Sequence, residues 1–204
     1  MEISDISDED GQLLVSTARK IVTEFVCSKQ RIKLGKDVEM KLSFDAGLFV
    51  TLNHNDELRG CIGFPLPSKI IRALPDAAIA AATEDPRFLP VKTSELDHIT
   101  FEVTLLTPPK EIRVEDPICL PKKIKVGRDG LIIKQGQYSG LLLPQVPIEY
   151  RWNEKEFLDH TCEKAGLPAG CWMQKHTKVF SFEGIIFREQ KPNGVIVREK
   201  LELT

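Results

Sequence analysis

The turn-forming stretch "NHND", Asn53 to Asp56, lies between two β-rich runs, "GLFVTL" and "ELRGCIGF". Two strands joined by so short a connection must be antiparallel neighbours, because parallel strands need a long crossover. Turn signals recur at "GRDG" and "GQYSG", between residues 127 and 140. Hairpins therefore dominate the strand pattern, which predicts antiparallel or mixed sheets rather than a doubly wound parallel sheet.

Helical patterns occur at three places. Apolar residues within 13–26 recur at helical spacing, and Ser7 with its following acids is a suitable N-cap. Pro75 suits the first position of an alanine-rich helix that ends before Pro86. Asn153 is expected to cap a third helix, with Glu156 completing a capping box. The combination of helices and hairpins predicts an α+β fold in which helices cover the sheets.

The remaining segments are assigned from their prolines, which interrupt regular structure, and from the alternation of apolar and polar residues. Residues 99–109 and 177–189 alternate as strands, with Glu102 on the polar side of the first. The stretch "FPLPSKIIRALP" is predicted to be a proline-broken connection, and residues 190–204 a polar tail.

Charge and cysteine content limit the classes of function. The formal charge of the 204-residue chain is −2, which offers no electrostatic basis for nucleic-acid binding. No run of about 18 apolar residues occurs, so a membrane span is not expected. The five cysteines contain no C-x-x-C pair. We therefore expect a reducing, cytoplasmic location and no disulfide framework.

The motif "LRGCIG" contains the first candidate for chemistry. Strand alternation places Arg59, Cys61 and Gly63 on one face, where the arginine would favour a reactive thiolate. Gly60 and Gly63 would leave room for a ligand to approach the backbone. The alternative is that Cys61 is a small structural cysteine in a glycine-kinked strand.

Three further charged residues are candidates for the same site. Glu102 lies in the middle of a strand, where it is either solvated or paired with Arg59 or Arg87. In "EDPRF", Asp85 and Arg87 form either a structural turn or the wall of an anion pocket.

Metal and cofactor chemistry find no support in the sequence. His160 and Cys162 lie two residues apart on a predicted helix, so they point in different directions and do not suit one metal. Motifs for nucleotide phosphates, dinucleotides and zinc proteases are missing from the sequence. No cofactor or metal is therefore expected. Trp152 and Trp172, near proline-rich segments, are either rims of a pocket or packing residues.

Several blocks together resemble the AMMECR family, a family common in archaea and also found in bacteria and eukaryotes. They are "LRGCIG", the alanine-rich helix leading into "DPRF", "FEVTLLTPP", "GRDGLII" and "LLLPQVPIEYRWNEKEFLDHTCEKAGLP". The resemblance covers about residues 13–188 and implies one domain over 1–204, built of two unequal, interleaved lobes, the smaller over about 55–95. It also implies an intracellular protein in a pathway shared with a Memo-like protein and a radical-SAM protein, without naming a substrate.

Two classes of function follow from these observations. In the first, the chain is an enzyme acting on a small molecule or peptide. Cys61 is the nucleophile or a thiol that contacts the ligand, and Glu102 is a base or an arginine partner. Arg59 orients an anionic group, and Asp85 and Arg87 form part of the wall of the site. In the second, the chain is a non-catalytic regulatory or protein-binding module whose glycines serve only the hairpin. Nucleic-acid binding ranks last because the net charge is slightly negative.

Overall fold

The structure is a computed structural model that describes residues 6–199. These residues form two compact units. The first comprises residues 6–107 and Ile185–Glu199, and the second comprises Pro108–Gly184. The segment 55–95 lies entirely within the first unit. None of the helices within 6–199 is long and apolar enough to cross a membrane.

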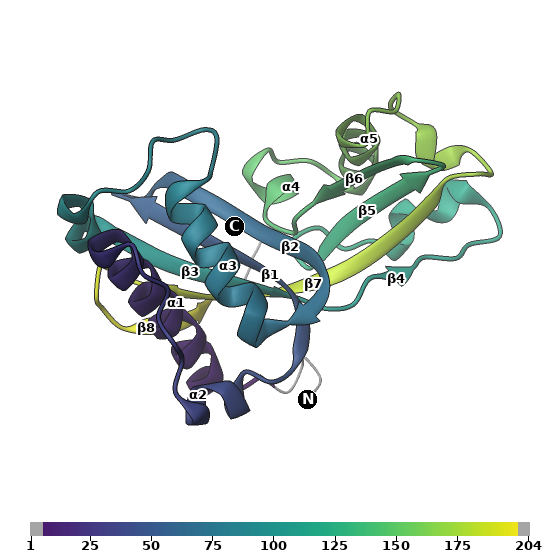
Figure 1. Cartoon of the computed structure of the whole chain (residues 1–204). Coiled ribbons are helices and arrows are strands. Elements are labelled where there is room, and N and C mark those ends of the chain that lie inside the picture. Colours follow the sequence, from purple (N-terminus) through teal and green to yellow (C-terminus); the bar gives the residue numbers. More distant parts are fainter. Residues whose placement is uncertain (1–5, 200–204) are drawn as a thin grey trace. The chain divides into compact units, whose positions relative to one another are not determined.

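The first unit is built on an antiparallel sheet with the strand order β2-β1-β3-β7, and β8 pairs with β7 (Figure 1). Its strands are β1 (Asp45–His54), β2 (Glu57–Lys69), β3 (Ile99–Leu106), the end of β7 (Lys178–Glu189) and β8 (Ile196–Glu199). β8 lies within the segment predicted to be a polar tail, and residues 200–204 of that segment lie outside the described residues. The antiparallel sheet and the α+β class are thus confirmed.

The β1–β2 hairpin forms at the predicted turn. Asn55 and Asp56 both have positive φ angles, 52° and 62°, which Asn and Asp tolerate better than most residues. The prediction that β2 stops before Pro65 is wrong, because the strand continues to Lys69. β2 is the edge strand, and the Cys61 amide points away from β1. Pro65 lies where the β1–β2 register is irregular, between the pairs Leu48–Phe64 and Ala46–Ser68, and such irregularities on an edge strand accommodate proline.

Helices α1 (Asp8–Ser28) and α3 (Ile70–Thr83) cover one face of this sheet (Figure 1). Ser7 caps α1 as predicted. The prediction that Pro75 begins the second helix is wrong: α3 begins at Ile70. A proline there removes the bond to the carbonyl four residues earlier and its ring crowds that carbonyl, and burial of the stripe Ile70, Ala73 and Leu74 offsets this cost.

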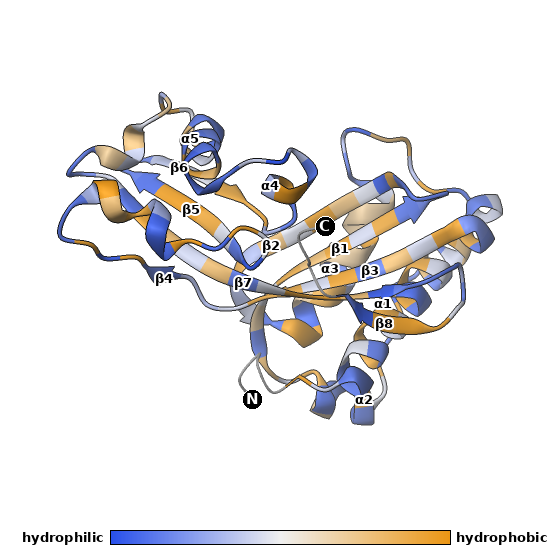
Figure 2. Ribbon diagram, turned by 180° about the vertical axis from the view of Figure 1, so that it is seen from behind, coloured by the Kyte–Doolittle hydropathy of each residue, from blue (hydrophilic) through white to orange (hydrophobic). Residues whose placement is uncertain are grey.

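The core of the first unit lies between these helices and the sheet. Its largest fully buried side chains include Leu14, Leu48, Leu52, Ile70, Leu74, Ile99, Phe101, Leu105 and Phe187. A short helix α2 (Lys36–Lys41) contributes no buried residue and is mostly hydrophilic (Figure 2). A 3-10 helix, η2 (Thr93–His98), precedes β3.

In the second unit, the antiparallel pairing continues along β7, which pairs with β5 on one side and with β4 on the other. The elements of this unit are β4 (Lys110–Glu111), η3 (Pro117–Cys119), η4 (Pro121–Lys123), β5 (Asp129–Gln135), β6 (Tyr138–Leu142), α4 (Val146–Glu149), α5 (Glu154–Lys164) and η5 (Cys171–Met173). The middle of β5, from Leu131 to Ile133, is apolar (Figure 2), and α5 packs on β5 and β6. Asn153 caps α5 with the predicted capping box.

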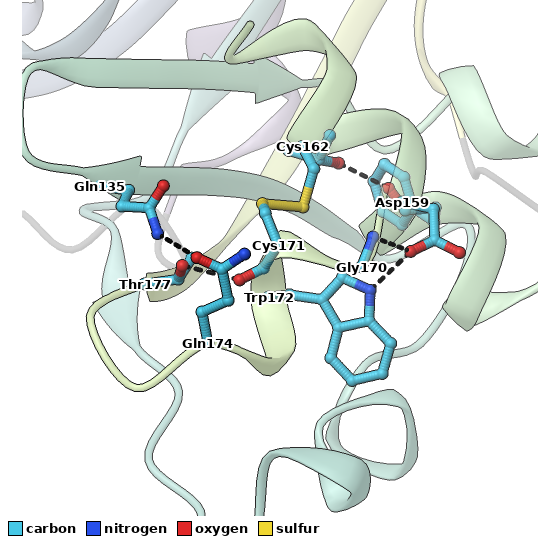
Figure 3. Close-up of a disulfide and its surroundings, with 10 residues drawn as sticks. Gln135, Asp159, Cys162, Gly170, Cys171, Trp172, Gln174 and Thr177 are labelled. Atoms are coloured by element: carbon cyan, nitrogen blue, oxygen red, sulfur yellow. Dashed lines mark hydrogen bonds between the residues drawn. A yellow bond between two sulfur atoms is a disulfide. The ribbon is translucent and has the colours of Figure 1, made fainter. Parts of the chain in front are cut away.

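One expectation about the cysteines is wrong. Cys162 and Cys171 form a disulfide, with S–S and Cα–Cα distances of 2.10 and 5.9 Å (Figure 3). The chain turns back between them through Gly166 and Gly170, both with positive φ, which brings two residues nine positions apart together. Disulfides also occur in intracellular proteins of hyperthermophilic archaea, so this bond does not decide the compartment.

Candidate functional site

Three polar side chains lie side by side across the sheet of the first unit. Two of them were predicted from the sequence, and the third was not. Thr51 of β1 is directly opposite Cys61 of β2 on one side and Glu102 of β3 on the other. Neighbouring strands are about 4.8 Å apart, so the three form a continuous row. The next row, Gly60, Leu52 and Phe101, faces the helices. The polar row therefore lies on the opposite face of the sheet, and we call it the Cys61 row.

Thr51, which the sequence analysis did not select, is the residue in contact with the thiol. Its hydroxyl donates to the sulfur of Cys61, with an Oγ1–Sγ distance of 3.3 Å. Cys61 is a free cysteine and is half-buried. The motif residue is thus in a polar environment rather than in the apolar core.

The electrostatic surroundings keep the Cys61 thiol protonated at neutral pH. Burial raises the pKa of the thiol, and the carboxylates of Glu102 and Asp85 raise it further. The hydrogen bond from Thr51 and the charge of Arg87 act in the opposite direction but do not reverse the shift in pKa. The donors that would stabilise a thiolate are therefore present, although the resting form is the thiol.

Asp85 and Arg87 hold the outer edge of β2 at Cys61. Asp85 Oδ2 accepts the Cys61 amide at 2.8 Å, and an Arg87 guanidinium nitrogen lies 3.4 Å from the Cys61 carbonyl oxygen. The Arg87 guanidinium also donates twice to Asp85, at 2.9 and 2.7 Å, and the Arg87 amide donates to it at 3.1 Å. We call this pair the edge clamp, because it occupies the positions that a further strand would take.

The edge clamp is a tightly coupled ion pair with one buried member. The Asp85 side chain is 2% exposed and that of Arg87 is 54% exposed. The hydrogen bond from Arg87 holds the pKa of Asp85 well below its usual range, and the same bond raises the pKa of Arg87. Asp85 is thus ionised and fully engaged at neutral pH.

Arg59 faces a different partner from the one predicted. Its guanidinium donates to Glu95 at 2.7 and 3.2 Å, and this bond lowers the pKa of Glu95. The cation that acts on the thiol is Arg87, not Arg59. Both predicted arginine partners of Glu102 are therefore engaged with other carboxylates, while Glu102 accepts from Thr104 at 3.5 Å.

The glycines of the motif are adjacent to backbone of the same chain. A Cβ on Gly60 would lie 2.1 Å from the Ala81 carbonyl oxygen, and one on Gly63 would lie 2.2 Å from that of Leu48. The space expected for a ligand at these two positions is thus occupied by α3 and by β1. Gly60 permits close packing of α3 on the hairpin.

No histidine is among the groups that shift the pKa of Cys61. His54 and His98 lie near each other, with ring centroids 6.2 Å apart, and His160 stacks on Trp152. Within residues 6–199, no cluster of three or more His, Cys, Asp or Glu residues suits a metal ion. Acid–base chemistry at Cys61 would accordingly rely on Glu102.

Comparison with known proteins decides the family. The AMMECR1 family model matches residues 15–187. The chain belongs to the AMMECR1 family. A protein of Pyrococcus abyssi is 50% identical over 98% of this chain and 100% of its own length, and one of Thermococcus kodakarensis is 52% identical over 96% and 98%. The crystal structure of an uncharacterised protein from Pyrococcus horikoshii is similar to this AMMECR1 chain with a TM-score of 0.90, at 49% identity over 96% and 99%.

Proposed function

We propose that this chain is an enzyme that acts on a small molecule or peptide at the Cys61 row. The observation that supports this is the cross-strand order Cys61, Thr51, Glu102, with the Thr51 hydroxyl 3.3 Å from the sulfur. A thiol, a hydroxyl and a carboxylate in sequence form a proton donor, a relay and a proton acceptor.

The chemistry proposed is nucleophilic attack by sulfur. When a substrate displaces water from the row, the Thr51 hydroxyl turns from the sulfur toward Glu102, passes its own proton to that carboxylate and takes the Cys61 proton in exchange. The sulfur then adds to an electrophilic carbonyl carbon of the substrate: the C–S bond forms as the C=O π bond opens, and the carbonyl oxygen takes the electron pair and then the proton held by Glu102. Thr51 and Arg87 stabilise the thiolate in this step, because both lower the thiol pKa. The edge clamp keeps the Cys61 backbone in place.

The alternative is a non-catalytic binding module, which is favoured by the packing roles of Gly60 and Gly63. In that account the motif exists to join the hairpin to α3, and Cys61 only contributes to a surface. The two proposals differ in what they expect from the sulfur atom itself. An enzyme requires it, whereas a binding surface tolerates a hydroxyl in its place.

The two proposals are separated by mass spectrometry of a small-molecule extract from an archaeon such as Thermococcus. The extract is incubated with the wild-type chain, with Cys61→Ser or with Cys27→Ser, whose cysteine is free and exposed. We expect at least one compound to be consumed by the wild type and by Cys27→Ser but not by Cys61→Ser. Compounds that co-purify with all three chains and stay unconverted would instead identify a binding module.

A further inference from the structure

The second unit contains a cleft that the Cys61 row does not involve. It has a volume of about 720 Å³ and is lined only by residues between 111 and 179. Residues 111–115, which begin at the end of β4, form part of its lining. The Ile112 amide makes a bond to the Val179 carbonyl at 2.8 Å, and residues of the following segment, Val114 and Pro117, form one wall. The volume is in the range typical of small-molecule sites.

The floor of the cleft includes an aromatic ring and aliphatic side chains. Trp172, Leu120 and Val179 all line it, and each is less than 5% exposed and part of the core of this unit. Met173 lies at the rim and is 52% exposed. These side chains suit the flat or aliphatic body of a ligand, because apolar contact with a fixed tryptophan costs little entropy.

The rim carries more positive than negative charge. Arg113, Lys175 and Lys178 oppose Glu111 and Glu115. Glu111 is shared by two of these cations, at 3.0 Å from Arg113 and 4.0 Å from Lys178. Lys175 is exposed and makes no ion pair with any described residue. An anionic group at the rim would complement this arrangement.

The wall that carries Trp172, Met173 and Lys175 is held in place by several independent bonds (Figure 3). The disulfide joins Cys171 to α5, and Asp159 of α5 accepts from the Gly170 amide at 2.8 Å and from the Trp172 indole at 2.7 Å. At the other end of this wall, Thr177 donates to the Cys171 carbonyl at 2.7 Å. The cleft is therefore preorganised, which reduces the entropy cost of binding.

From these observations we propose that this cleft is a binding site for a small amphiphilic anion. The apolar body of the ligand lies against Trp172 and Leu120, and its carboxylate, sulfonate or phosphate group is bound by Lys175 and Lys178. No residue of the Cys61 row lines the cleft, so this proposal stands whether or not that row is catalytic.

The test uses 8-anilinonaphthalene-1-sulfonate, an aromatic molecule with one negative charge, and the disulfide-intact full chain. The chain has two tryptophans, so Trp152→Phe leaves Trp172 as the only indole reporter. In this background, Lys175→Glu is compared with Lys155→Glu, since Lys155 is an exposed lysine at the start of α5 and outside the cleft. Both changes are on surface side chains, so both variants are expected to fold.

We expect one probe molecule per chain, with quenching of Trp172 emission as it binds. Lys175→Glu should weaken binding by about tenfold or more, and Lys155→Glu by less than about twofold. Equal weakening by the two variants would overturn the proposal. So would binding of several probe molecules per chain without quenching of Trp172.

Discussion

The main-chain amide of Cys61 donates a hydrogen bond to Oδ2 of Asp85 at 2.8 Å. This bond joins the motif "LRGCIG" to the segment "DPRF", 24 residues further along the chain. It ends the sheet at β2, because the carboxylate and Arg87 take the place of a neighbouring strand. The two motifs therefore form one structural device, which fixes the position of the Cys61 backbone.

Asp85→Asn should lower the free energy of unfolding at pH 7 by about 1–3 kcal/mol. The Asn side chain has only one oxygen, so it cannot accept hydrogen bonds from both Arg87 and the Cys61 backbone as the carboxylate does. The Asp85 pKa is depressed in the folded state, so its contribution to stability is complete above the unfolded pKa of about 3.9 and is lost progressively as the pH falls from there through the lower folded pKa. Urea unfolding at pH 7 and pH 3 measures this difference.

The gap in stability between the wild type and Asp85→Asn should narrow at the lower pH. Asp56→Asn is the control, since Asp56 lies in an exposed turn with a positive φ that Asn also tolerates. An equal loss of stability in the two variants, or a gap that widens in acid, would contradict the role of the edge clamp.

Gly60→Ala should destabilise the first unit by about 1–3 kcal/mol or more, because its new methyl group would lie 2.1 Å from a backbone oxygen of α3 that cannot move alone. Gly35→Ala is a matched control: a Cβ there meets nothing within 4 Å, and φ is −71°. Thermal unfolding of the two variants tests this directly. Similar melting temperatures would show that the hairpin and α3 do not pack as described.

Thr51→Val should raise the pKa of the Cys61 thiol further, because it removes a hydrogen bond that lowers that pKa. Alkylation of Cys61 at a fixed pH should then be slower, as followed by mass spectrometry of the peptide containing it. Thr51→Ser keeps the hydroxyl and should restore the wild-type rate. Unchanged kinetics in Thr51→Val would mean that the hydroxyl does not act on the sulfur.

The double variant Cys162→Ala/Cys171→Ala should lose about 2–3 kcal/mol of stability, the value expected for closing a loop of this length. Cys27→Ala, at an exposed free cysteine, is the control. Urea unfolding under non-reducing conditions gives the comparison. The disulfide would be contradicted if all three chains were equally stable and the thiols of Cys162 and Cys171 were free in the wild type.

The features predicted correctly from the sequence depend on local chemistry. Ser7 and Asn153 cap their helices because their side chains bond the next amides of the chain. The turn at Asn55 and Asp56 forms because both residues tolerate positive φ. The alternation of β3 predicted that Phe101 is buried and Glu102 is not.

The features that could not be predicted depend on tertiary partners. Counting outward from the turn pairs Thr51 with Gly60, but an irregularity between Leu52 and Asn53 shifts the register and brings Thr51 opposite Cys61. A one-residue shift of this kind leaves no local signal. The disulfide likewise depends on how the chain returns from α5, which the spacing of Cys162 and Cys171 does not reveal.

The most direct test of the Cys61 row is the pH dependence of Cys61 alkylation in the wild type, in Glu102→Gln and in Glu57→Gln. Glu57 is an exposed carboxylate on the same strand and is not among the groups that shift the thiol pKa. We predict a half-point above the ordinary thiol value of about 8.5 in the wild type and in Glu57→Gln, and a lower one in Glu102→Gln, because the Glu102 charge raises the thiol pKa. A wild-type half-point at or below about 8.5, unaffected by Glu102→Gln, would contradict the account.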